Sequence, residues 1–344
     1  MTILENVLMS GQTTMKVGGP ARYLIDVKDE EEMLRALAFS REKGLPYFIL
    51  GGGSNIVVSD DGFPGVVIAL KMRGVSREDA PDGKTVLLTG AAGENWDDFV
   101  AYAVENGLWG IENLSGIPGT VGAAPVQNIG AYGAEARQAI ESVRVYDPES
   151  GEARDMTNVE CEFGYRTSMW KRPRENQLII LSVSFRLSRR AKPNISYRDL
   201  ALYFKQEGDI VSPSIEHIRE AVLQIRAGKF PDLSLVGTAG SFWKNPTISK
   251  TVLRELEARY PGLPSFPVSD SQAKIPLAWI LDRVCSFKGH AHGRASLYEN
   301  QPLVLITFPG CTTSEVEGLA AHVSRAVHEK TGIVIEREVV SLGQ

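Results

Sequence analysis

The stretch from Ser115 to Gly133 constrains this chain more than any other segment, because it contains no charged residue. It reads Ser-Gly-Ile-Pro-Gly-Thr-Val-Gly-Ala-Ala-Pro-Val-Gln-Asn-Ile-Gly-Ala-Tyr-Gly. Most of these residues are small, so a bulky ligand could lie directly against the backbone. A loop of this length without charge is seldom a plain linker, which favours a binding loop. A buried structural loop is the alternative interpretation.

A second glycine-rich segment follows the short apolar strand expected at Pro46–Leu50. It consists of Gly51, Gly52, Gly53, Ser54 and Asn55. Successive N–H groups in such a turn can surround a pyrophosphate, and the two polar side chains add hydrogen-bond donors. It is neither a dinucleotide-binding Gly-x-Gly-x-x-Gly motif nor a P-loop. A plain tight turn is the alternative.

The elements expected around these segments alternate between strand and helix. Strands are predicted at Tyr23–Val27 and Gly65–Leu70, with a helix between them that Asp29 caps and Gly44 ends. This pattern is typical of an α/β unit. We also expect the charged stretch Ser76–Lys84 to connect two domains, a helix from Asn95 to Gly107, and a last strand at Ile333–Val340.

Length, charge and cysteine content narrow the function classes. A chain of 344 residues is too long for one ordinary core, so two or three domains are expected. The net charge of −5 gives no basic field for nucleic acid or for an anionic membrane surface. The three cysteines lie far apart, and His290 and His292 lack metal-ligand spacing, so no metal site is predicted. The sequence shows neither a signal peptide nor a membrane-spanning apolar run, so a cytoplasmic location is expected. A monomeric state is a separate expectation.

Four further residue groups could carry chemistry. Arg166 lies between aromatic residues and could bind a carboxylate with two hydrogen bonds, although a surface arginine on a strand end is the commoner case. Ser241 follows a third glycine-rich turn and could donate a proton. Arg226 and Lys229 form a positive pair suited to a diphosphate. Glu338 by itself would be read as an exposed strand residue.

Taken together, the runs Ile49–Val57, Ile117–Gly133, Gly164–Ser168, Gly237–Pro246 and Ile335–Val339 closely resemble the UDP-N-acetylenolpyruvoylglucosamine reductase family. The resemblance implies an α+β fold: an FAD-binding fold of the vanillyl-alcohol oxidase type, made of two α/β subdomains, plus a smaller α+β substrate-binding domain. The expected division is residues 1–74 and 75–210 for the two FAD-binding subdomains and 211–325 for the substrate-binding domain. Residues 326–344 are expected to return to the FAD-binding region.

The resemblance also implies roles for individual residues. Catalysis is expected from Arg166, Ser241 and Glu338, and substrate binding from Tyr197, Arg226, Lys229 and Asn245. The larger group expected to bind FAD is drawn from the two glycine-rich segments: Gly51, Gly52, Gly53, Ser54, Asn55, Ser115, Gly116, Ile117, Pro118, Gly119, Gly122, Ala123, Gln127, Asn128, Gly130, Ala131 and Tyr132.

The implied activity is the NADPH-dependent reduction of UDP-N-acetylglucosamine enolpyruvate to UDP-N-acetylmuramate, in peptidoglycan precursor biosynthesis. Hydride would pass from reduced FAD to the vinyl carbon, and Ser241 would supply the proton. Two alternatives stay open at this point. One is another FAD oxidoreductase of the same fold, such as a hydroxy-acid or sugar oxidase; the other is a flavin-binding module without catalysis.

Overall fold

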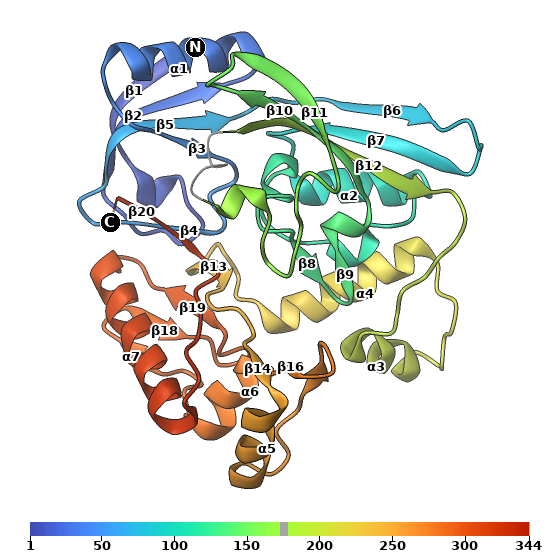
Figure 1. Cartoon of the computed structure of the whole chain (residues 1–344). Coiled ribbons are helices and arrows are strands. Elements are labelled where there is room, and N and C mark those ends of the chain that lie inside the picture. Colours follow the sequence, from blue (N-terminus) through green and yellow to red (C-terminus); the bar gives the residue numbers. More distant parts are fainter. Residues whose placement is uncertain (173–177, 344) are drawn as a thin grey trace. The chain divides into compact units, whose positions relative to one another are not determined.

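Two structural units divide the chain, and each is assembled from three separate segments. The computed structural model describes residues 1–172 and 178–343 (Figure 1). The first unit comprises Met1–Asn6, Arg22–Gly52 and Pro64–Ala227. The second comprises Val7–Ala21, Gly53–Phe63 and Gly228–Gln344. The four-part division expected from the resemblance stays a prediction.

The first sheet of the first unit contains the predicted α/β pattern. Its strand order is β1 (Thr2–Leu8), β2 (Pro20–Val27), β5 (Phe63–Leu70) and β3 (Tyr47–Leu50). Strands β3 and β5 run parallel, and helix α1 (Glu30–Glu42) precedes them. The Asp29 carboxylate caps α1 by accepting the Glu32 N–H at 2.8 Å, and Gly44 ends it with a φ of +61°. These predicted boundaries are confirmed.

The second sheet of this unit is antiparallel. Its strands are, in spatial order, β11 (Glu152–Thr157), β10 (Ile140–Asp147), β12 (Ile179–Ser188), β7 (Thr85–Ala91) and β6 (Val75–Asp79). The prediction of an interdomain connection at Ser76–Lys84 is wrong, since its first part is strand β6, paired with β7. All five β6 residues are exposed, so its charged side chains meet water while its backbone completes the sheet. The polar composition of this stretch is therefore compatible with a strand as well as with a linker.

Helix α2 (Trp96–Glu105) packs against this second sheet (Figure 1). Its apolar face is buried as predicted, and the rings of Trp96 and Phe99 lie 5.6 and 5.3 Å from that of Phe185 on β12. Two more helices complete this part, α3 (Arg198–Gln206) and α4 (Ile215–Lys229). The predicted Asn95 cap is confirmed by hydrogen bonds from the N–H groups of Asp97 and Asp98 at 2.9 and 3.1 Å.

The second unit has its own apolar core, which is built around a four-stranded sheet and helix α7 (Thr313–Thr331). The strand order is β13 (Gly237–Ser241), β19 (Val304–Thr307), β18 (Ala295–Leu297) and β17 (Ala291–His292). A three-stranded sheet consists of β14 (Thr247–Ser249), β16 (Gln272–Lys274) and β15 (Phe266–Pro267). Two helices accompany these sheets, α5 (Lys250–Arg259) and α6 (Leu277–Trp279), and a π-helical turn (Ile280–Val284) follows α6.

The predicted last strand, Ile333–Val340, is wrong for most of its length. Only β20 (Val340–Leu342) is regular, and it pairs in parallel with β4 (Ile56–Val58). Before it, a single bridge joins Arg337 to Trp243. Ile333, Ile335 and Val339 are nevertheless buried. The alternation of apolar residues that predicted a strand therefore belongs to an extended segment without a continuous partner strand.

The mixture of helices with parallel and antiparallel strands confirms the α+β class. Within the part of the chain that the structure describes, every helix is too short or too polar to span a bilayer.

Candidate active site

The glycines after strand β3 pack directly against the uncharged loop. A Cβ atom built on Gly52 would lie 2.7 Å from the Cα atom of Gly119, and one built on Gly51 would lie 2.9 Å from the hydroxyl oxygen of Thr120. A side chain at position 52 would push the two backbones apart, so this contact requires glycine there. We call Gly51, Gly52, Gly119 and Thr120 the glycine junction. It joins two segments predicted to bind the same cofactor.

Thr120 is the member of the glycine junction that the sequence did not single out. Its hydroxyl oxygen is buried and has no hydrogen-bond partner among the described residues. Its backbone is fixed by a bridge to Asn95. A buried hydroxyl without a partner is costly, and here it lies beside glycine backbone, where it can donate to an anionic oxygen. The junction therefore fits a phosphate group. In the sequence, a hydroxyl residue between Gly119 and Gly122 was the feature that could have indicated this role.

Arg166 occupies a tight turn and reaches the same loop. Gly164 and Thr167 exchange backbone hydrogen bonds of 3.0 and 3.4 Å around this turn. Arg166 itself has a φ of +52°, which is uncommon for a residue other than glycine. Its Nη2 donates to the Gly130 carbonyl at 2.7 Å. The predicted catalytic arginine therefore lies beside the predicted flavin loop, partly buried rather than on the surface.

Two polar side chains of the predicted FAD-binding group hydrogen-bond to the protein itself. The Asn128 amide donates to the Glu135 carboxylate at 3.0 Å and to the Gly164 carbonyl at 2.9 Å. The Ser115 hydroxyl donates to the Glu112 carbonyl at 2.6 Å. These bonds shape the loop, and the role of both side chains toward FAD stays a prediction.

Tyr132 and Tyr197 meet edge to face, with ring centroids 5.6 Å apart. Burial raises the pKa of Tyr132 to about 12, so its phenol is neutral. The Asn113 amide donates to the carbonyls of Tyr132 and Asn194, both at 2.8 Å, and so ties the segment before Tyr197 to the uncharged loop. The stretch after Tyr197 is helix α3. The predicted substrate tyrosine thus contacts the predicted flavin loop.

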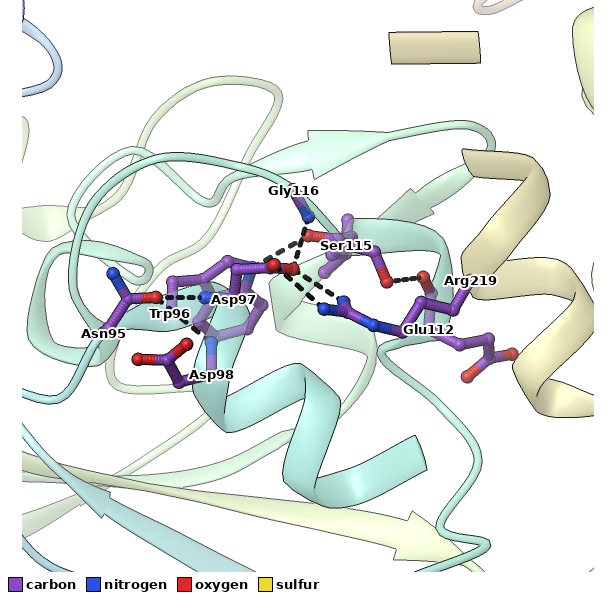
Figure 2. Close-up of polar contacts among 9 residues, drawn as sticks. Asn95, Trp96, Asp97, Asp98, Glu112, Ser115, Gly116 and Arg219 are labelled. Atoms are coloured by element: carbon purple, nitrogen blue, oxygen red, sulfur yellow. Dashed lines mark hydrogen bonds and ion pairs between the residues drawn. The ribbon is translucent and has the colours of Figure 1, made fainter. Parts of the chain in front are cut away.

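Asp97 joins helix α2 to the uncharged loop and to helix α4 (Figure 2). Its Oδ1 accepts the Gly116 N–H at 2.6 Å. Arg219 on α4 donates to both carboxylate oxygens, at 2.6 and 2.9 Å. Figure 2 shows these bonds converging on one carboxylate, close to the Asn95 cap.

Charge and burial act together around this carboxylate. Burial raises the pKa of Asp97, but hydrogen bonds from Arg219 and Gly116 and the nearby positive charges outweigh it, so the net pKa lies below its usual range. For Arg226 on α4, burial lowers the pKa, and Tyr132 and Asp97 oppose that shift. The shift favours the charged form of Asp97, whereas for Arg226 burial is the larger effect and its net pKa lies below the usual range.

Gly53, which directly follows the first two glycines of the glycine junction in the chain, belongs to the second unit. Its φ is +63°, and a Cβ atom there would lie 2.3 Å from the Gln12 carbonyl oxygen, so only glycine fits. Its own carbonyl accepts the Thr14 N–H at 3.0 Å. The Thr14 hydroxyl donates to the Thr238 carbonyl at 2.7 Å. Thr14 therefore connects Gly53 to β13, the strand that ends at Ser241.

Glu338 lies in the irregular segment before β20 and is buried, so its interpretation as an exposed strand residue is wrong. Its N–H donates to the Phe242 carbonyl at 2.9 Å, and its carbonyl accepts the Asn55 side-chain amide at 3.2 Å. Phe242 directly follows Ser241. The backbone of Glu338 is therefore held between the Asn55 side chain and Phe242, the neighbour of Ser241.

Two further predicted substrate residues, Asn245 and Lys229, are placed by α6 and α4. The Asn245 Oδ1 accepts the Leu277 N–H at 2.9 Å, at the start of α6, and Lys229 is the last residue of α4. Arg166 belongs to the first unit, and Ser241 and Glu338 belong to the second. Within residues 1–172 and 178–343, no group of three histidine, cysteine or acidic side chains could hold a metal ion.

Two family models match the chain in succession. The FAD binding domain model matches residues 21–157, which include all of Gly51–Asn55 and all of the uncharged loop. The model of the UDP-N-acetylenolpyruvoylglucosamine reductase C-terminal domain matches residues 232–342, which include Ser241 and Glu338.

Whole-chain relatives carry the same family name. A UDP-N-acetylenolpyruvoylglucosamine reductase of Ralstonia nicotianae is 40% identical, over 95% of each chain. One of Porphyromonas gingivalis is 36% identical, over 98% of this chain and 99% of its own. The crystal structure of a UDP-N-acetylenolpyruvylglucosamine reductase from Thermus caldophilus aligns over 99% of both chains, with 26% identity and a TM-score of 0.69. The chain carries an FAD-binding domain and belongs to the UDP-N-acetylenolpyruvoylglucosamine reductase family.

Proposed function

We propose that this chain is an NADPH-dependent flavoenzyme that reduces UDP-N-acetylglucosamine enolpyruvate to UDP-N-acetylmuramate for peptidoglycan synthesis. Its membership in the reductase family supports this reaction. The observation that carries it is the hydrogen bond between Glu338 and Phe242, the residue after Ser241, which holds the segments of the serine and of the buried glutamate side by side in the second unit. A cytoplasmic location and a monomeric state stay expectations.

The glycine junction, continued by Gly53, Ser54 and Asn55, would hold the FAD pyrophosphate. The buried Thr120 hydroxyl supports this assignment because it needs an acceptor. The rest of the uncharged loop would line the flavin, with Gln127 and Tyr132 at its far end. When bound, FAD supplies the electron chemistry, taking hydride from NADPH and passing it to the vinyl CH2 carbon of the sugar substrate.

The protein's own residues would manage the charge that follows hydride addition. The hydride's electron pair forms the new C–H bond, and the displaced π pair of the vinyl group becomes an enolate on the substrate carboxylate. Arg166 together with an appropriately protonated Glu338 would stabilise that charge. Ser241 would then donate its proton to the carbon that bears the carboxylate. That transfer completes the lactyl ether with one hydride and one proton gained.

The UDP part of the substrate would be bound by positive and polar side chains. Arg226 and Lys229 offer positive charge to the diphosphate, and Tyr197 and Asn245 would contact the remainder. The division of the chain into FAD-binding residues 1–74 and 75–210 and substrate-binding residues 211–325 belongs to this same proposal.

The visible spectrum of the purified protein is the first test. We expect a yellow protein whose FAD is released by acid precipitation, is bleached by NADPH, and is reoxidised by the enolpyruvyl UDP-sugar. Mass spectrometry should then find UDP-N-acetylmuramate. A colourless protein that takes up no FAD contradicts the proposal, and bleaching by hydroxy acids or sugars instead of NADPH supports an oxidase.

Gly52→Ala should weaken FAD binding. The added methyl group would press on Gly119 and force the glycine junction apart. This overpacking costs about 1–3 kcal/mol, which corresponds to roughly 5- to 160-fold in FAD affinity. Titration of the apoprotein with FAD, followed by flavin fluorescence, measures this. Gly228→Ala is the control, because a Cβ there meets open space. Equal FAD affinity in both variants would remove the junction from the cofactor site.

A further inference from the structure

The Asp97–Arg219 ion pair connects helix α2, the uncharged loop and helix α4, close to Arg226, the arginine proposed to bind substrate. Asp97 lies in the first turn of α2, where a carboxylate is favoured by the helix dipole. It binds the Gly116 N–H of the uncharged loop and both outer nitrogens of the Arg219 guanidinium. The side chains of Arg219 and Asp97 are 17% and 33% exposed, so water screens the pair only in part.

Arg219 shares one face of α4 with Arg226. Residues 219, 223 and 226 are spaced by four and three positions, which aligns them along a helix. A Cβ atom built on Gly116 would lie 2.9 Å from Leu223 Cδ2 and 3.0 Å from Arg226 Nε. The face of α4 that carries Arg219 therefore lies against Gly116. Arg226 contacts Gly116, and the N–H of Gly116 donates to Asp97.

We infer that Asp97 and Arg219 are positioning residues, which set the rotation of α4 and hold the Arg226 guanidinium beside Gly116. The inference rests on the proposed function, in which Arg226 contacts the UDP-sugar. The pair acts through Arg226 and touches no reacting atom, so its loss should affect substrate binding far more than chemistry.

Electrostatics supports the same role. Burial disfavours the cationic form of Arg226, and the Asp97 charge is one of the two groups that oppose this effect. Asp97→Asn keeps the size of the side chain but removes the charge and one acceptor. In this variant α4 should be held less firmly, and the positive charge of Arg226 should lose a nearby negative charge.

A second bidentate ion pair in the same unit provides a matched control. Arg186 on β12 donates to Glu141 on β10 at 2.7 and 2.6 Å, and both side chains are about two-fifths exposed. Neither residue belongs to the predicted site. Glu141→Gln removes an ion pair of the same kind, away from α4 and from the uncharged loop.

The test compares steady-state and half-reaction kinetics of Asp97→Asn, Arg219→Gln and Glu141→Gln with those of the unmodified enzyme, each loaded with FAD. We expect the KM for the enolpyruvyl UDP-sugar to rise about tenfold in the first two variants, with kcat changed by less than about threefold. FAD content, and flavin bleaching at saturating NADPH, should stay near normal. Glu141→Gln should match the unmodified enzyme throughout.

Two further variants separate positioning from simple stability. Arg219→Lys keeps the charge but cannot form the bidentate hydrogen bonds to Asp97, so its substrate affinity should lie between those of Arg219→Gln and the unmodified enzyme. The double variant Asp97→Asn with Arg219→Gln should be no worse than either single change, because both remove the same interaction. If the KM of Asp97→Asn and Arg219→Gln equals that of Glu141→Gln, the inference is overturned. Failure of the unmodified enzyme to reduce the UDP-sugar would instead reject the proposed function.

Discussion

Ser241→Ala should leave the reduction of the flavin by NADPH near normal and slow its reoxidation by the enolpyruvyl sugar by about 10²–10⁴-fold. A serine hydroxyl is a weak acid, so it gives its proton usefully only to a strong base such as the carbon of an enolate. That carbon exists only in the second half-reaction. Stopped-flow absorbance of the flavin measures both halves in one protein.

The position of Ser241 allows a clean comparison. It is the last residue of β13, and the next residue holds the Glu338 segment by a 2.9 Å hydrogen bond through its backbone, which the substitution keeps. Ser241→Cys should regain part of the rate, since a thiol can also donate a proton. Ser271→Ala, in the exposed β15–β16 hairpin, is the control. Equal slowing of both halves would make Ser241 a structural residue.

Removal of Arg166 or of the Glu338 carboxyl should slow sugar reduction by about 10²–10³-fold, the loss typical of one group that stabilises developing negative charge. Glu338→Gln keeps the shape of the side chain, and the segment stays in place because its contacts to Phe242 and Asn55 use backbone atoms of residue 338. Glu336→Gln is the control, since the Glu336 carboxylate is largely exposed and pairs with Lys244.

The backbone at position 166 decides which arginine variants are informative. With a φ of +52°, Arg166→Ala adds conformational strain to the loss of the guanidinium, whereas asparagine tolerates this region better. Arg166→Asn should therefore fold as well as the unmodified protein while losing the same rate. Turnover within a few-fold of normal for Arg166→Asn and Glu338→Gln would show that neither group acts on the intermediate.

Local features were predicted well from the sequence because neighbouring residues determine them. The Asp29 and Asn95 caps, the Gly44 ending and the buried face of α2 all follow from residues within one or two turns. The glycine-rich segments were also recognised, although their direct contact at Gly52 and Gly119 was not a sequence property.

Features that depend on distant partners were missed or misread. Asp97 and Arg219 are 122 residues apart, and nothing near either residue indicates the other. The polar sequence of strand β6 predicts a linker, because the partner of its backbone is strand β7 and its exposed side chains carry no sign of that pairing. Glu338 was read as exposed because the alternation around it suggested a strand with one face in water.

The assembly of the second unit from three separate segments has a consequence for how the chain acquires its structure during synthesis. The Thr307 hydroxyl donates to the Met15 carbonyl at 2.6 Å, across a separation of 292 residues. At roughly 5–20 residues per second, a ribosome leaves the early segment without this partner for about 15–60 s. Met15 and Val17, which are fully buried at the end, stay without their later packing partners for that time. We therefore expect a chaperone that shields this early segment to reduce aggregation of the nascent chain.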